Sequence, residues 1–294
     1  MVLVIFLFID PAWAWGPATH LHYGMNVLER LVELDLPLRV LLSSQPFPFL
    51  YGCVSADIVL AKKLGSAMTH CHKWHNGFRL IEEAQTPRTK AFAIGYVTHL
   101  AADTISHNCY VPSKTIESYD SGFLKHMYWE LRFDKKLTDR KTLKLFKEIA
   151  KGDFVDCDAH LERLVPTRIF DFSFNKRIFN HLLLLQGLKH WQKLWDGISN
   201  SAPWPLRDRE IKDFSERSMT AVMSFLKEQN ASKFLAADPI GQERLKIAHR
   251  LRRHFKTCLR ENRLPSLPTI RNVIQKFAQE PFTSIEVTGL LKLN

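Results

Sequence analysis

Apolar residues along most of this chain recur every three or four positions, the spacing that buries one face of an α-helix. The alternation typical of a half-buried strand occurs only over 170–174, a stretch too short and isolated to imply a sheet. We therefore expect an all-α protein. Pro37, Pro46 and Pro48 predict a loop-rich stretch that ends near residue 52. The helices predicted from the spacing are 19–34, 53–64, 74–84, 89–106, 121–137, 140–150, 175–195, 209–229, 241–260 and 270–278.

The length of 294 residues, 46% of them hydrophobic, allows one large domain or two smaller ones. The proline-flanked stretch 199–206 is the best linker candidate. We therefore predict a first domain over 15–198 and a basic helical extension over 207–294. No apolar run reaches the roughly 20 residues of a spanning helix, which excludes a polytopic membrane protein. The five cysteines form no paired framework, so disulfides do not organise the fold.

The first fourteen residues resemble a secretory signal peptide. An apolar run from Val2 to Ile9 is followed by Ala12-Trp13-Ala14, a small-x-small cleavage site, although no Lys or Arg precedes the run. The alternative is a buried first strand or helix of the mature fold. We predict a signal peptide over 1–14 and a secreted, periplasmic or cell-envelope protein. Cleavage after Ala14 would give Trp15 a free amine, which can chelate a metal ion together with the carbonyl of the same residue.

Histidines and carboxylates recur at helical spacing within the first 130 residues. His99, Asp103 and His107 fall at i, i+4 and i+8, which places all three on one face of a helix. His126 and Glu130 repeat the four-residue spacing on a second predicted helix. Imidazole and carboxylate are ligands that zinc prefers. A single pair could equally be solvated or satisfied in the core, but two helices with five such residues predict a metal site.

Other histidines and one carboxylate could join this site. Asp57 follows a small-residue turn, where it could be a ligand or the N-cap of the segment after it. The segment from His70 to His75 holds three imidazoles, of which at most one or two can point into the same site. His20 opens the first predicted helix, five positions after Trp15. A lone histidine there would usually be structural, so the prediction of His20 as a metal ligand depends on Trp15.

Taken together, these residues resemble the zinc-dependent phospholipase C family, which shares its fold with glycosylphosphatidylinositol-specific phospholipase D and the fungal single-strand nucleases. The resemblance covers about the first half of the chain, in the family's order. It is carried by Trp15-Gly16-x-x-x-His20, the turn before Asp57, His72-x-Trp74, Gly95-x-x-x-His99-x-x-x-Asp103-x-x-x-His107 and His126-x-x-x-Glu130. The four-residue step from Asp103 to His107 is similar to the phospholipase D-like branch rather than to the secreted bacterial phospholipases.

The resemblance implies a helical enzyme with up to three zinc ions at the base of a cleft. It assigns the first ion to Asp57, His72, His99 and Asp103. It assigns the second to His107, His126 and Glu130. It assigns the third to the amine and carbonyl of Trp15 and to His20, with Asp103 bridging to the first. The choice of His72 over His70 or His75 stays open. Asp57 could also act as a general base that orients the attacking water.

A zinc-bound water has a pKa of about 7, which supplies a nucleophile at neutral pH. Together with this site, the resemblance implies hydrolysis of a phosphodiester, with a phospholipid as the leading substrate. One alternative is a single-strand nuclease on the same fold. Another is a non-catalytic module in which zinc is structural. The net charge of +11 and the basic amphipathic segment 244–260 favour an anionic membrane surface or nucleic acid, although a packed helix with a solvated basic face gives the same pattern. The sequence indicates no obligate protein partner.

Overall fold

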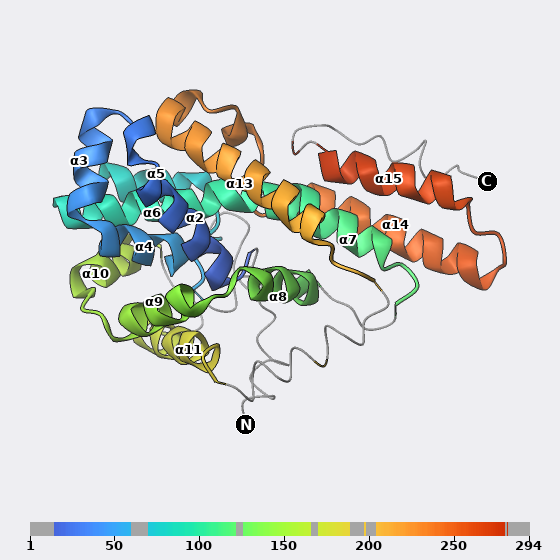
Figure 1. The fold of residues 1–294 in the computed structure, drawn as a ribbon, viewed down its shortest axis with the longest axis horizontal. Coiled ribbons are helices and arrows are strands. Elements are labelled where there is room, and N and C mark those ends of the chain that lie inside the picture. The colour runs from blue at the N-terminus through green and yellow to red at the C-terminus, as the bar shows by residue number, and fades with distance from the viewer. Residues whose placement is uncertain are drawn as a thin grey trace.

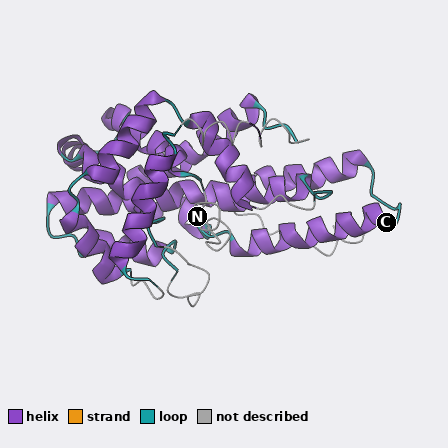
Figure 2. Ribbon diagram, turned by 90° about the horizontal axis from the view of Figure 1, so that it is seen from below, coloured by secondary structure: helices purple, strands orange, loops and turns teal. Residues whose placement is uncertain are grey.

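Helices make up the regular structure of the computed structural model, which describes residues 15–59, 70–121, 126–165, 170–188, 197, 204–279 and 281. No strand occurs within these residues (Figure 2), as the sequence predicts. The predicted signal peptide over 1–14 lies outside them. The α-helices are α2 (Pro17–Glu29), α3 (Leu36–Ser44), α4 (Pro46–Ser55), α5 (Trp74–Glu82), α6 (Pro87–Ile105), α7 (Val111–Glu117), α8 (His126–Leu137), α9 (Arg140–Lys151), α10 (Val155–Leu164), α11 (Phe172–Leu185), α13 (Asp208–Glu228), α14 (Gln242–Arg260) and α15 (Leu267–Gln279).

Prolines begin helices in the stretch predicted to be loop. The side chain of Asp35 caps α3, which carries Pro37 in its first turn, and α4 begins at Pro46. Proline is tolerated there because the first N–H groups of a helix have no intrahelical partner. The predicted beginning of a helix at Cys53 is therefore wrong, since Cys53 lies near the end of α4 and residues 56–59 form turns.

Helix α6 is the central helix of the fold, and α4, α5 and α13 pack against it (Figure 1). A capping box formed by Thr86 and Thr89 begins α6. Two glycines allow α4 and α6 to touch backbone to backbone. A Cβ on Gly52 would lie 2.0 Å from the Phe92 carbonyl oxygen, and one on Gly95 would lie 2.1 Å from that of Phe49. This contact brings the end of α4 against the middle of α6.

A π-helical turn, η4 (Ser106–Tyr110), joins α6 to α7. The i to i+5 hydrogen bonds of a π-turn widen the helix, so a side chain within it points in a different direction from its α-helical position. His107 lies in this turn and therefore departs from the helical face of His99 and Asp103.

The described residues form two hydrophobic clusters. The larger one includes residues of α13, such as Phe214 and Val222, together with the helices before it. The smaller one lies between α7, α14 and α15 and contains Ile116, Ala248, Leu251, Phe255, Ile270, Val273 and Phe277. Figure 1 shows α14 and α15 side by side next to α7. Among the described helices, none has the length and apolar character needed to cross a membrane. The division into 15–198 and 207–294 stays a prediction.

Candidate metal centre

Four segments bring imidazoles and carboxylates into one buried cluster. His20 comes from α2, Asp57 from the turn after α4, His72 from the turn before α5, and His99 and Asp103 from α6. Each of these residues is at most 2% exposed. Ligand atoms of His20, Asp57 and His99 lie within 4.8 Å of one another, as do those of His72, His99 and Asp103. The cluster therefore has the residue types and spacing of a metal site.

Asp103 lies at the middle of this cluster. Its Oδ1 is 3.3 Å from Nε2 of His20, and its Oδ2 is 3.2 Å from Nε2 of His99 and 3.4 Å from Nε2 of His72. Oδ1 of Asp57 lies 3.3 Å from the same nitrogen of His72. Three imidazoles therefore present Nε2 to two carboxylates.

The orientation of His99 indicates that its Nε2 atom is a hydrogen-bond acceptor. Its Nδ1 lies 2.9 Å from the carbonyl oxygen of Cys53, to which only a protonated Nδ1 can donate. A neutral ring bound in this way leaves the lone pair of Nε2 directed at the cluster. That lone pair faces Asp103 and also Nε2 of His72, 3.0 Å away. A metal-ligating histidine usually donates its other ring N–H to a backbone carbonyl in the same manner.

The electrostatics of the cluster fit a bound cation. Burial, and next the neighbouring His99, lower the pKa of His20, so its ring is neutral at pH 7. Burial alone would raise the pKa of Asp103, but positive charge on His99 and His20, when these rings are protonated, lowers that pKa well below its usual range, which is the effect a bound cation would have in their place. Neither ring nitrogen of His20 and neither carboxylate oxygen of Asp103 makes a hydrogen bond of good geometry. Because a buried carboxylate without such bonds is costly, a divalent cation suits this site.

His107 and Glu130 form a second group next to η4. Nε2 of His107 lies 3.7 Å from Oε1 of Glu130 on α8, and its Nδ1 donates to the carbonyl oxygen of Pro239 at 2.5 Å. Both side chains are buried. The π-turn thus directs His107 toward α8 rather than along the face of α6. The side chain of His126, predicted as a third ligand here, lies outside the described residues.

Trp15 is anchored beside the cluster by its side chain. Its indole N–H donates to the carbonyl oxygen of Ala102 at 3.1 Å, and its ring packs against Tyr110 and Phe133. Trp15 therefore lies next to Asp103 in the fold and directly before the helix that carries His20. Because residue 14 is outside the described residues, the role of the Trp15 amine stays a prediction.

One buried carboxylate near this site escaped the sequence analysis. Oδ1 of Asp134, on α8, accepts hydrogen bonds from the backbone N–H and the hydroxyl of Thr19 at 2.7 and 2.9 Å. Gly16, the N-cap of α2, has no side chain to provide this cap. Asp134 follows Glu130 by four positions, so it shares a helical face with a predicted ligand, which is the only signal that the sequence offered.

The structure also distinguishes the three histidines of the 70–75 segment. His72 faces the cluster, whereas His75 is exposed on α5. The ring of His70 accepts a hydrogen bond from the backbone N–H of His72 at 3.2 Å, and its ligand atom lies within 4.8 Å of those of Cys71 and His72. Of the three, His72 is thus the one that meets Asp57 and Asp103.

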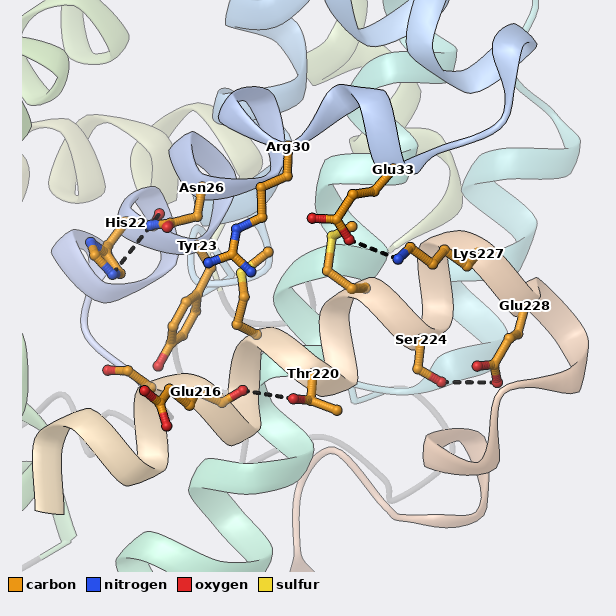
Figure 3. A pocket seen from close by; sticks show the side chains of 13 residues that line it. His22, Tyr23, Asn26, Arg30, Glu33, Glu216, Thr220, Ser224, Lys227 and Glu228 are labelled. Carbon is orange, nitrogen blue, oxygen red and sulfur yellow. Dashed lines mark hydrogen bonds and ion pairs between the residues drawn. The ribbon is translucent and has the colours of Figure 1, made fainter.

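A separate pocket with a volume of about 540 Å³ lies between α2 and α13 (Figure 3). Arg30, Glu33, Glu216 and Lys227 are among its lining residues, and none of the predicted ligands is. It is therefore not the metal centre. Residues 60–69 and 122–125 lie outside the described residues, and the cleft over the cluster stays a prediction.

A comparison with protein families matches residues 19–195, more than half of the chain, to the family described as zinc dependent phospholipase C. The chain belongs to this family. The matched stretch contains every predicted ligand except Trp15. Comparisons with curated proteins and with solved structures give no match. Family membership and the buried cluster together support a zinc site formed by these histidines and aspartates.

Proposed function

We propose that this protein is a zinc-dependent hydrolase that cleaves the phosphodiester of a phospholipid with water as the nucleophile. The observation that supports it most directly is the convergence of three imidazole Nε2 atoms on Asp103 and Asp57 in a chain of the zinc-dependent phospholipase C family. A structural zinc site would need only four ligands in a closed shell. The larger ligand set favours catalysis.

Asp57, His72, His99 and Asp103 would hold one zinc ion, and His107 and Glu130, with His126, would hold a second. A third would bind His20 and the amine of Trp15 after removal of residues 1–14. Bound zinc supplies a water of lowered pKa and a positive charge that stabilises the phosphoryl oxygens.

The protein's own residues orient this chemistry. The hydrogen bond between His99 and the Cys53 carbonyl keeps the Nε2 lone pair directed inward. Asp103 stays ionised, so it keeps a full negative charge for a cation. Asp57 lies at the edge of the cluster nearest His72 and would accept the proton of the attacking water.

The test is zinc analysis of the purified protein together with hydrolysis of a phosphatidylcholine substrate. We expect His99→Ala to lose zinc and to lower hydrolysis at least about a hundredfold, because removing one ligand opens the shell. His75→Ala, at an exposed position, is the matched control and should keep both. Absence of zinc in the unsubstituted protein would refute the proposal. Cleavage of single-stranded DNA in place of lipid would make the protein a nuclease with the same metal centre.

We also infer that the outer face of α14 approaches an anionic membrane. Lys246, Arg250, Arg253 and Arg260 are exposed on this helix, while its apolar face is buried in the smaller hydrophobic cluster. Leu259 and Leu267 are 42% and 62% exposed at the turn between α14 and α15. Cations beside exposed leucines suit a lipid headgroup layer better than nucleic-acid phosphates, which offer nothing apolar.

Vesicle sedimentation tests this surface. Arg250→Glu with Arg253→Glu should weaken binding to phosphatidylserine vesicles at least tenfold, since each basic residue near such a surface contributes about 1 kcal/mol. The control is Lys147→Glu with Lys151→Glu, which makes the same change in net charge at two exposed positions of α9. Equal losses in both double variants would mean that only net charge matters.

The proposed location is outside the cytoplasm, after cleavage between Ala14 and Trp15. Amino-terminal sequencing of exported protein should find Trp15 first. A sequence that begins at Met1 would remove both the proposed export and the third zinc site.

A further inference from the structure

Residues 237–244, which follow η6 (Lys233–Ala236) and end in the first turn of α14, lie against two of the segments that carry predicted metal ligands. We call these residues the bridging segment. It lies outside the stretch matched to the zinc-dependent phospholipase C family, which ends at residue 195. Its contacts therefore belong to this chain's own C-terminal region.

The bridging segment binds the π-turn that carries His107. The carbonyl oxygen of Pro239 accepts the Nδ1 hydrogen of His107 at 2.5 Å, and that of Asp238 accepts a hydrogen bond from the Asn108 side chain at 2.8 Å. In return, Nε of Arg244 donates to the Asn108 carbonyl oxygen. Arg244 is 7% exposed and also donates to the Phe277 carbonyl of α15 at 2.8 Å. The ring of His107 is thus held from outside its own helix.

The same segment contacts the residues directly after His72. The indole N–H of Trp74 donates to the Ala237 carbonyl oxygen at 2.9 Å, and Nζ of Lys73 lies 3.3 Å from Oδ1 of Asp238. Oδ1 of Asp238 also accepts a hydrogen bond from the backbone N–H of Ile240, which holds the turn. The bridging segment therefore connects the His72 turn with the His107 turn.

A glycine makes the close approach possible. Gly241 has φ +61°, in the left-handed region, and a Cβ there would lie 2.3 Å from the His107 carbonyl oxygen. Any larger residue must push the two backbones apart. The distance from the Pro239 carbonyl to His107 thus depends on a residue without a side chain.

We propose that the bridging segment is a positioning element for the second metal subsite. The Pro239 carbonyl selects the tautomer of His107 that presents Nε2 toward Glu130, and Gly241 sets how closely that carbonyl approaches. The proposal rests on the proposed function, because it takes His107 and Glu130 as zinc ligands. It adds that part of the metal centre lies beyond the family region, in the C-terminal helices.

The experiment measures zinc affinity of the metal-free full chain by competition with a chromophoric chelator. Gly241→Ala should weaken the binding of one zinc ion per chain about ten- to a hundredfold, the usual effect of losing an outer-shell partner of a ligand. The affinities of the other zinc sites should stay unchanged. Gly187→Ala is the matched control, because the nearest atom to its added Cβ is 3.5 Å away. Pro239→Ala keeps the carbonyl and should stay within a fewfold of the unsubstituted protein.

Two further variants separate positioning from general damage. In a His107→Ala background, Gly241→Ala should have no additional effect on zinc affinity, since the imidazole that the bridging segment positions is absent. Asp238→Ala loosens the turn without adding a clash. It should weaken the binding of the same zinc ion, by a smaller factor than Gly241→Ala does. Unchanged affinity in folded Gly241→Ala and Asp238→Ala, or an equal loss at all sites, would overturn the inference. If the unsubstituted protein binds no zinc, the proposed function fails first, and the inference fails with it.

Discussion

Two histidines that are predicted to bind zinc are each oriented by a hydrogen bond to a backbone carbonyl. His99 and His107 each donate Nδ1–H to a backbone carbonyl of a distant segment, at Cys53 and at Pro239. A backbone carbonyl cannot rotate away as a side chain can, so each ring is held in one tautomer and one direction. The geometry of the metal centre thus depends on where α4 and the bridging segment lie.

Asp134 supplies a prediction at the residue scale. Asp134→Ala leaves the hydroxyl of Thr19 buried without its acceptor and the backbone N–H of Thr19 with only the Gly16 carbonyl oxygen at 3.1 Å, so we expect the free energy of unfolding to fall by about 1–3 kcal/mol. Asp134→Asn keeps an acceptor oxygen and should lower the free energy of unfolding by less than Asp134→Ala does. Urea unfolding of the metal-free protein measures both. Equal stability of the alanine variant and the unsubstituted protein would mean that Asp134 does not cap α2.

Asp134 also predicts a pH effect. Burial, partly opposed by the Thr19 hydrogen bonds, raises its pKa to about 6. A raised carboxyl pKa means that the folded protein keeps a proton that the unfolded chain releases, so stability falls as the pH rises from about 4 to 6 and is then level. The shift corresponds to at most about 3 kcal/mol. Asp134→Asn should reduce this fall in the metal-free protein, and an unchanged pH profile would contradict the assignment.

At the scale of elements, the contact between α4 and α6 positions most of the cluster. Gly52 and Gly95 let the two helices touch, and this contact carries the Cys53 carbonyl to His99. The π-turn η4 has the complementary effect, since it directs His107 away from α6 and toward Glu130. One nearly continuous helical rod therefore supplies ligands to two subsites.

The prediction at this scale is that Gly95→Ala separates the two helices. Its Cβ would meet the Phe49 carbonyl oxygen at 2.1 Å, and overpacking of this kind costs about 1–3 kcal/mol. Because the His99 to Cys53 hydrogen bond spans the same contact, zinc affinity should fall as well. Gly187→Ala should change stability by less than about 0.5 kcal/mol. Thermal unfolding with and without zinc distinguishes the two effects; a Gly95→Ala protein as stable as the control would rule out the close contact.

At the scale of the whole molecule, the predicted ligands come from segments between α2 and α8, and the bridging segment before and within the start of α14 contacts two of these segments. Zinc that binds only the folded state stabilises it, by about 2.7 kcal/mol per site at a concentration of 100 Kd. We expect a chelator to lower the Tm and added zinc to restore it. The Tm of His99→Ala should change less between chelator and added zinc than the Tm of the unsubstituted protein. A Tm that is the same with and without chelator would mean that the cluster holds no metal.

The sequence by itself determined the helical class of this protein and indicated a set of candidate metal ligands. Helical spacing of apolar residues reports which face a helix buries, and i, i+4 spacing reports which side chains share that face, so both are local properties of the chain. His99 and Asp103 meet at 3.2 Å as their spacing predicts.

The tertiary structure alone decided which ligands meet across segments. It decided among three neighbouring histidines in favour of His72, turned His107 toward Glu130 through a π-turn, and brought Pro239 to His107 across 132 positions. Prolines that were expected to interrupt the chain instead begin α3 and α4. Such outcomes depend on helix packing and backbone approach between distant segments, for which neither spacing nor composition carries a signal.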